Sequence, residues 1–158
     1  MLSGIMLSGM TCDQTAATFT LQGLQPADAI LIASDLQFMA VLTTLGLYDN
    51  KMGDEGAKAI AEALKVNAVL TELGLGYNQI SHEGAKAIAE ALKVNSVVTT
   101  LYLGSNSIGD EGAKAIAEAL KVNAVLTFLS LRDNNLGDAG KTAVQDVVKG
   151  RSGFQLYL

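Results

Sequence analysis

Tryptophan is absent from this sequence, and proline, cysteine and histidine occur once each, as Pro26, Cys12 and His82. A single cysteine excludes an internal disulfide and a cysteine-rich zinc site, and a single histidine excludes a metal site built on a histidine pair. Lysine and arginine never form a run, and the formal net charge is −5. We therefore expect no nucleic acid among the partners of this protein.

Long apolar runs are also missing. The most hydrophobic helix-like stretch, residues 29–42, is interrupted by Asp35 and is too short to cross a bilayer. The first ten residues, MLSGIMLSGM, are apolar but contain no basic residue, which argues against a secretory signal. Because disulfide-stapled ends are impossible as well, we expect a soluble, cytoplasmic protein without a membrane partner.

Apolar residues make up 49% of the 158 residues, which favours a folded chain over a disordered one. This length suits one domain, and we assign residues 1–158 to it. Aromatic residues are only 5% of the chain, whereas alanine, leucine and glycine are abundant. Such a composition is more typical of a repetitive fold than of an irregular enzyme core.

The chain contains internal repeats. The segment GDEGAKAIAEALKVNAV occurs at 53–69 and again at 109–125, with SHEGAKAIAEALKVNSV at 81–97, so the starts are 28 residues apart. A drifted copy follows at 137–153, and Ile32 and Leu36 precede Ile60 and Leu64 by the same 28 residues. We divide the chain into a degenerate N-terminal repeat or cap at 1–41, repeats at 42–69, 70–97, 98–125 and 126–153, and a terminal strand at 154–158.

The first half of each repeat reads L-x-x-L-x-L-x-x-N, as in Leu42, Leu45, Leu47 and Asn50. Alternation at the x-L-x-L core predicts a strand with one buried face. The asparagine then turns the chain, and its amide supplies donors and an acceptor for backbone groups in that turn. The same positions recur in the later repeats, ending at Asn78, Asn106 and Asn134.

The second half of each repeat predicts a helix. Asp54 is expected to cap its N-terminus, and Asn67 is expected to end it in the left-handed conformation. His82 replaces this aspartate in the next repeat, and we interpret it as a tolerated substitution. Around Ile60, a buried stripe forms from Gly56, Ala57, Ala63 and Leu64, while Lys58, Glu62 and Lys65 point outward.

These motifs and their period resemble the ribonuclease-inhibitor-like leucine-rich repeats, a class found in intracellular innate-immune receptors and in activators of the small GTPase Ran. The resemblance implies an α/β solenoid, or horseshoe, with a parallel sheet on the concave face and helices on the convex face. The spacing of the two layers agrees with this shape. Strands lie about 4.8 Å apart and helices need about 8–10 Å, so the stack must curve with the sheet inside. The resemblance also implies a non-enzymatic module for binding other proteins.

The repeats differ mainly at exposed strand positions. Three of the four tyrosines lie there, together with a phenylalanine and an arginine, and such side chains are favoured at interfaces. We therefore predict a partner-binding patch at Tyr48, Asp49, Glu72, Tyr77, Tyr102, Phe128 and Arg132. The alternative is that solvent-facing strand positions drift freely and that aromatic residues simply suit strands.

No catalytic constellation is apparent. Glu62, Glu90 and Glu118 recur in register beside lysines and are interpreted as a solvated surface. Cys12 has no neighbouring base to activate it, and the scattered glycines form no phosphate-binding loop. We expect no enzymatic activity, no cofactor and no metal.

Three functions remain open. The leading one is a module that binds a protein or peptide on the concave face, for example as the recognition part of an immune-type receptor. A self-assembling structural protein is the second, and a GTPase regulator of the Ran-activator type is the third, although the acidic tail of those proteins is missing.

The end of the chain resembles a further strand. If the last repeat is one residue shorter than the others, Leu156 and Leu158 take the places of Leu129 and Leu131. An open strand edge at this end predicts a homodimer, unless the last strand is itself the cap.

Overall fold

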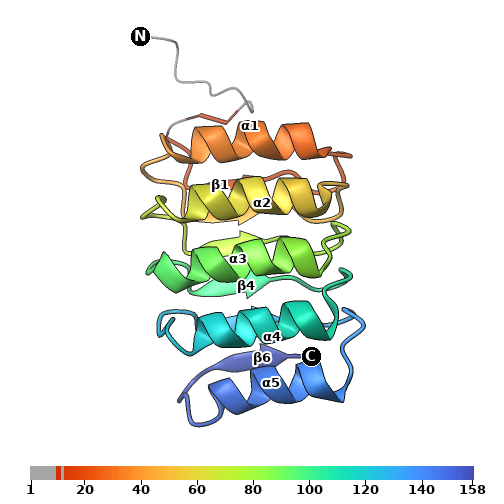
Figure 1. Cartoon of the computed structure of the whole chain (residues 1–158). Coiled ribbons are helices and arrows are strands. Elements are labelled where there is room, and N and C mark those ends of the chain that lie inside the picture. The colour runs from red at the N-terminus through yellow and green to blue at the C-terminus, as the bar shows by residue number, and fades with distance from the viewer. Residues whose placement is uncertain (1–9, 12) are drawn as a thin grey trace.

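The computed structural model describes residues 10, 11 and 13–158 and, within them, builds a solenoid of six short strands and five helices (Figure 1). The strands are β1 (Ala16–Thr18), β2 (Thr44–Gly46), β3 (Glu72–Gly74), β4 (Thr100–Tyr102), β5 (Phe128–Ser130) and β6 (Gln155–Tyr157). The helices are α1 (Pro26–Leu36), α2 (Gly53–Leu64), α3 (His82–Val94), α4 (Gly109–Leu120) and α5 (Asp138–Val148). The helices form one layer and the strands the other.

The strands form one parallel sheet in chain order, β1 to β6, which confirms the predicted fold class. From β1 to β5 each residue pairs with the residue 28 positions later, as in Thr44 with Glu72. Between β5 and β6 the step is one residue shorter, because Leu129 pairs with Leu156. The last strand therefore takes the register that its leucines predict.

The core lies between the sheet and the helices. The leucines of β2 to β5, such as Leu45 and Leu73, are fully buried, and so are Ile60 and its equivalents in the other helices. Pro26 begins α1, where its missing N–H has no helical partner to lose. Because packed helices need more room than paired strands, the stack curves with the sheet inside, and we call the outward side of the strands the concave face.

The asparagine that follows each of β2 to β5 satisfies backbone groups of its own turn, as predicted, and also binds the preceding repeat. The Nδ2 atom of Asn106 donates to the carbonyls of Leu103 and Gly104 in its own turn and of Leu75 in the preceding repeat, at 2.9–3.3 Å. Its Oδ1 accepts from the backbone N–H groups of Asn78 and Ile80, at 2.9 and 3.0 Å. The buried amide thus satisfies backbone groups of two neighbouring repeats.

The prediction that Asn67 ends its helix in the left-handed conformation is wrong. Asn67 does not adopt the left-handed conformation, and α2 ends with Lys65 still in the right-handed helical region. Its Oδ1 instead accepts from the N–H groups of Val69 and Leu70, while its Nδ2 donates to the carbonyl of Leu36 in the preceding repeat. Asn95 and Asn123 repeat this arrangement. A second row of buried asparagines therefore joins the helix ends.

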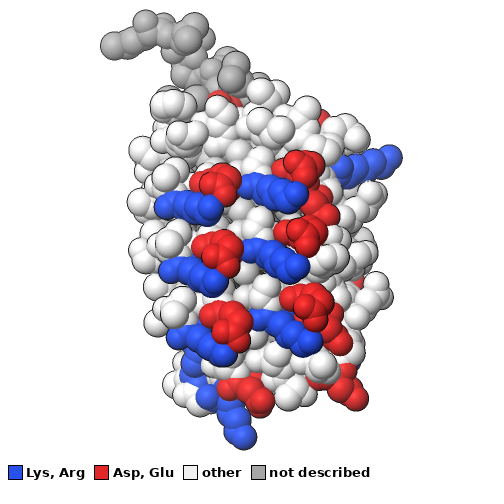
Figure 2. Space-filling view, viewed as in Figure 1, with Lys and Arg blue, Asp and Glu red and all other residues white. Residues whose placement is uncertain are grey.

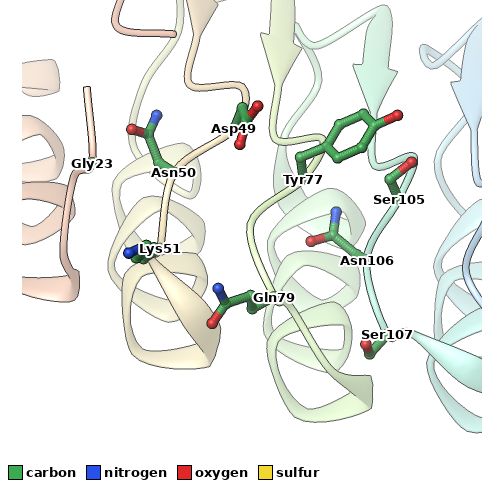
Figure 3. A pocket seen from close by; sticks show the side chains of 9 residues that line it. All are labelled: Gly23, Asp49, Asn50, Lys51, Tyr77, Gln79, Ser105, Asn106 and Ser107. Atoms are coloured by element: carbon green, nitrogen blue, oxygen red, sulfur yellow. The ribbon is translucent and has the colours of Figure 1, made fainter. Parts of the chain in front are cut away.

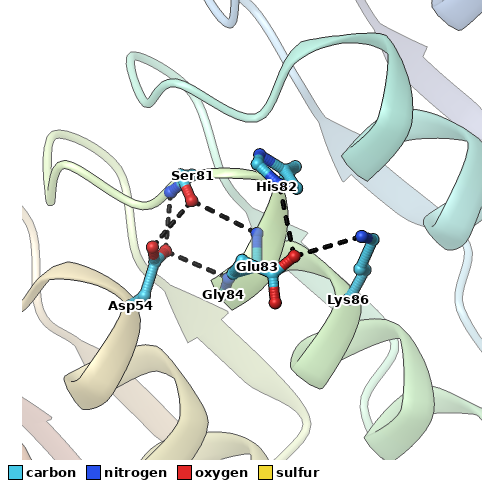
Figure 4. A network of polar contacts seen from close by, with 6 residues as sticks. All are labelled: Asp54, Ser81, His82, Glu83, Gly84 and Lys86. Atoms are coloured by element: carbon cyan, nitrogen blue, oxygen red, sulfur yellow. Dashed lines mark hydrogen bonds and ion pairs between the residues drawn. The ribbon is translucent and has the colours of Figure 1, made fainter.

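The prediction that Asp54 caps its own helix is also wrong. Asp54 lies inside α2, which begins at Gly53 after Met52 and has no side-chain cap. Its carboxylate reaches the next repeat and accepts from the backbone N–H groups of Ser81 and Gly84, at 2.7 and 3.0 Å (Figure 4). The N-cap of α3 is Ser81, and His82 is the first helical residue rather than a substituted cap.

Residues 1–9 and Cys12 lie outside the described residues, so the expectations for the apolar N-terminal segment and for the thiol stay predictions. Met10 is described and is buried in the core beside the first repeat. In the part of the chain that is described, no helix has the length and apolar character needed to cross a membrane.

Candidate functional site

Four aromatic rings form a continuous line across the concave face, and we call Tyr48, Tyr102, Phe128 and Tyr157 the aromatic ladder. Their ring centroids lie 6.0 Å apart from Tyr48 to Tyr102, 4.8 Å from Tyr102 to Phe128, and 5.2 Å from Phe128 to Tyr157. All three pairs are tilted, the arrangement that the charge distribution of aromatic rings favours. The ladder starts just after β2, passes over β3 and ends on β6.

Two glycines make the first contact of the ladder possible. A Cβ atom added to Gly74 would lie 2.6 Å from Cζ of Tyr48, and one added to Gly76 would lie 2.9 Å from its Cδ1. The Tyr48 ring therefore lies flat over backbone that carries no side chain. Any larger residue at position 74 would occupy the place of the ring, so Tyr48 reaches Tyr102 across the intervening repeat only because β3 ends in glycine.

The Tyr48 hydroxyl stays protonated in this setting. Burial raises the pKa of Tyr48 well above its usual value, and the neighbouring Tyr102 and Glu72 raise it further. The phenol is therefore a neutral hydrogen-bond donor at any physiological pH. This favours a role in contact and hydrogen bonding rather than in proton transfer.

Arg132 extends the ladder at its other end. Its guanidinium carbon lies 4.9 Å from the centroid of the Tyr157 ring, within the range of a cation–π contact. Both side chains are exposed, and Tyr157 keeps 37% of its surface accessible. A guanidinium in a cation–π contact keeps N–H donors that can bind a further group.

Glu72 stands beside the ladder on β3. Its strand neighbours in register are Thr44 and Thr100, both uncharged, and its side chain is half-buried. Its negative charge acts on the Tyr48 hydroxyl, as the pKa of that tyrosine shows. Glu72 therefore places a carboxylate near the Tyr48 end of the ladder, away from the Arg132 end.

Asp49 and Tyr77 lie apart from the ladder, on adjacent turns after the strands (Figure 3). Both have left-handed backbone, with φ of 54° and 57°, and Tyr77 is 60% exposed. With Lys51, Gln79 and Ser107 they border a hollow of about 320 Å³ at the rim of the solenoid. The structure thus brings together Tyr48, Glu72, Tyr102, Phe128 and Arg132 and leaves Asp49 and Tyr77 at this rim.

Tyr157 is the ladder residue that the sequence prediction missed. Once Leu156 is aligned with Leu129, Tyr157 falls in register with Ser130 and hence in the same row as Tyr102. The signal was therefore present in the terminal strand. It was missed because outward positions were compared only among the strands of the four complete repeats, and the terminal strand was not included.

The convex face has a different electrostatic character. Six lysines on α2, α3 and α4 or directly after them each pair with the glutamate three residues earlier, at 2.5–3.1 Å: Lys58, Lys65, Lys86, Lys93, Lys114 and Lys121. Figure 2 shows these pairs as regular rows of alternating charge over the helices. Glu62, Glu90 and Glu118 belong to these pairs and form the solvated surface that the sequence predicts. Among the described residues, no group of three or more His, Cys, Asp or Glu side chains is placed to hold a metal ion.

Two solved structures share this architecture. The actin-binding site 2 of leiomodin-1 matches with a TM-score of 0.75 and 25% identity, over 87% of this chain and 80% of that chain. The tropomodulin C-terminal domain of Caenorhabditis elegans matches with a TM-score of 0.73 and 11% identity, over 87% and 84% of the two chains. Among curated proteins, no sequence matches the chain.

The leucine-rich-repeat family model matches four segments, 39–61, 66–89, 94–117 and 122–143. Each segment contains one strand, the buried asparagine that follows it, and more than half of one helix, and together they span more than half of the chain. The sequence match and the observed solenoid agree repeat by repeat, and the chain belongs to the leucine-rich-repeat family.

Proposed function

We propose that this chain is a non-enzymatic binding module that holds a protein or peptide partner on its concave face. The observation that carries the proposal is the aromatic ladder with Arg132 at its end. Tyrosine, phenylalanine and arginine supply large contact areas, and each ring here is fixed by its neighbours and by a hydrogen-bonded strand. Little side-chain freedom is lost when a partner covers such a surface.

The comparisons support a protein as the partner. The leiomodin-1 structure is named for an actin-binding site, so a solenoid of similar shape presents a surface to another protein. The contrast between the two faces supports the concave side. The lysines on the convex side of α2, α3 and α4 are already paired with glutamates within the chain, whereas the ladder exposes rings that a partner can cover.

We also propose a subfamily for this chain and a cellular setting in which it would bind its partner. The 28-residue period and the asparagine after each strand support a place among the ribonuclease-inhibitor-like repeats. Recognition within an immune-type receptor, in the cytoplasm, is one setting in which such a module would work.

The test is a pull-down from extract of the native cell, quantified by mass spectrometry. We expect the Tyr102→Ala/Phe128→Ala double variant to lose the proteins that the wild type retains, because two central rings are removed. The Lys86→Ala/Glu90→Ala variant on the convex face is the matched control and should retain them. Equal capture by the ladder variant, with loss in the convex variant, would refute the proposal.

Self-association is a second candidate function, and the position of β6 favours it. Within the described sheet β6 has β5 on one side and no strand on the other, and Leu156 and Leu158 beside the core are only partly buried. Such an edge readily pairs with another chain. Sedimentation velocity up to about 100 µM, a concentration that detects association near −5 kcal/mol, should then show a dimer that Tyr157→Lys weakens. Phe128→Ala, which changes the same ladder away from the edge, should leave the dimer intact.

A further inference from the structure

The charged side chains of the concave face differ from those of the convex face in having no ion-pair partner. At the outward positions from 44 to 48 and their equivalents in the later strands, Glu72 and Arg132 are the two charged residues. Within the described residues neither takes part in an ion pair, whereas all six convex lysines of α2, α3 and α4 do. The concave face therefore carries one free charge of each sign.

The two charges lie on opposite sides of Tyr102. Glu72 is on β3, Tyr102 on β4, and Arg132 just beyond β5, so one diagonal crosses all three. Two strand spacings of about 4.8 Å and four residues of about 3.3 Å separate their backbones by roughly 16 Å. An extended segment spans that distance with about five residues.

The surroundings of each charge match one kind of side chain. Beside Glu72 lie the ring of Tyr48, held neutral, and uncharged threonines, and aromatic faces with a carboxylate attract a lysine or arginine. The guanidinium of Arg132 lies over the Tyr157 ring and takes part in no ion pair within the described residues, so its N–H groups can bind a carboxylate. Between the charges, Tyr102 and Phe128 offer apolar surface.

From this arrangement we infer that the concave face binds an extended protein segment that places a basic side chain against Glu72, an apolar side chain on Tyr102 and an acidic side chain against Arg132. This inference rests on the proposed function and specifies the chemistry of its partner. The basic and acidic residues of that segment lie four or five positions apart. If Glu72 is replaced by a basic residue, or Arg132 by an acidic one, the chain should prefer the opposite charge at the matching position of the partner.

The probe for the test is a phage-displayed library of random 12-residue peptides selected on the immobilised full chain. Wild type should select peptides with a basic and an acidic residue four or five positions apart and an apolar residue between them. Selection on Glu72→Lys should replace the basic residue by an acidic one, and selection on Arg132→Glu should replace the acidic residue by a basic one. Glu90→Lys on the convex face is the matched control and should select the wild-type pattern.

Affinities measured by fluorescence anisotropy make the outcome quantitative. A wild-type peptide should bind Glu72→Lys about tenfold more weakly, a loss of about 1.4 kcal/mol, and a peptide with its basic residue reversed should regain the loss. Peptides that require Tyr102 and Phe128 but are indifferent to both charge reversals would overturn this inference and leave the proposed function standing. Peptides that bind without needing either ring, or a library that yields none, would overturn both.

Discussion

The carboxylate of Asp54 accepts hydrogen bonds from both the backbone N–H and the hydroxyl of Ser81, at 2.7 Å each, across the boundary between two repeats. The same carboxylate accepts from the N–H of Gly84, in the first turn of α3. Asp54 thus supplies the negative charge and the acceptor that a helix N-terminus favours, but it supplies them to the helix of the next repeat. Each such aspartate joins two repeats.

An aspartate binds the next helix in this way at every second junction between repeats. Asp110 repeats the bond of Asp54, accepting from the N–H groups of Gly137 and Gly140 at 2.7 and 3.1 Å, and α5, like α3, begins after an extended residue. At the other two junctions the equivalent residue is Pro26 or His82. There the helices begin at Gly53 and Gly109, which take left-handed backbone with φ of 57° and 61°. The left-handed start of a helix is thus found at the two junctions where the preceding repeat lacks this aspartate.

Asp54→Ala is expected to lower the free energy of unfolding by about 1 kcal/mol at neutral pH, the typical cost of losing a helix cap. Burial raises the pKa of Asp54, but hydrogen bonds from Ser81 and Gly84 and the charge of Lys58 outweigh it, so that the pKa lies below its usual value. A lowered carboxyl pKa stabilises the fold above the unfolded value and loses that effect as pH falls through the folded value. The difference between wild type and variant should therefore shrink below about pH 4.

Urea denaturation at a series of pH values measures this difference. Asp138→Ala is the matched control, because Asp138 begins α5 but makes no bond to another repeat in the described structure. A cost for Asp54→Ala that persists unchanged at roughly pH 2 would show that the carboxylate is not the source of the stability.

His82→Asp should raise stability. His82 occupies the position of Asp54 one repeat later, but its ring lies beside Glu83 of its own helix, with Nε2 and Oε1 3.2 Å apart, and α4 has no side-chain cap. An aspartate there can accept from the N–H groups of Gly109 and Gly112, as Asp54 does from Ser81 and Gly84. Gly109 must exchange its bond to the Asn134 carbonyl for this one, so we expect a gain of about 0.5–1 kcal/mol. Thermal unfolding that shows no gain over His82→Ala would contradict the interpretation.

Asn106→Leu should lower the free energy of unfolding by about 1–3 kcal/mol or more, because backbone groups in two repeats lose a buried partner. Stability in a solenoid depends on neighbouring repeats, so the damage should spread to both sides of the turn. Gln155→Leu, which likewise replaces an amide by leucine but at an exposed position, is the control for chemical denaturation. Equal midpoints for the two variants would be incompatible with the role we assign to Asn106.

Gly74→Ala should disrupt the ladder while leaving the fold intact. Its Cβ would displace the ring of Tyr48, which is the free end of a side chain and can rotate away. Gly104→Ala is the matched control, because its Cβ would make only ordinary contacts, at 3.6 Å or more. We expect Gly74→Ala to change the near-UV circular dichroism of the tyrosines and to weaken partner binding, with far-UV signal unchanged. Indistinguishable effects of the two substitutions would mean that the position of the Tyr48 ring does not depend on the absence of a side chain at Gly74.

The sequence allowed the strands, the buried helix stripe and the turn asparagines to be predicted, because period and local pattern determine them. Asp54 and Asn67 were assigned wrongly because local capping rules look for partners within one helix, whereas theirs lie in neighbouring repeats. The candidate patch was recognised from variation between repeats. Its connection through Tyr48 was not, because that contact depends on two glycines of an intervening strand.

The central claim is that the partner covers the concave face, and a two-dimensional NMR titration tests it most directly. With a peptide selected on the wild-type chain or a partner captured from the cell, the largest chemical-shift changes should fall on the ladder residues and their strand neighbours. The backbone around Lys86 and Glu90 on α3 should change little. Shift changes concentrated on α2, α3 and α4, with the ladder unaffected, would contradict the account.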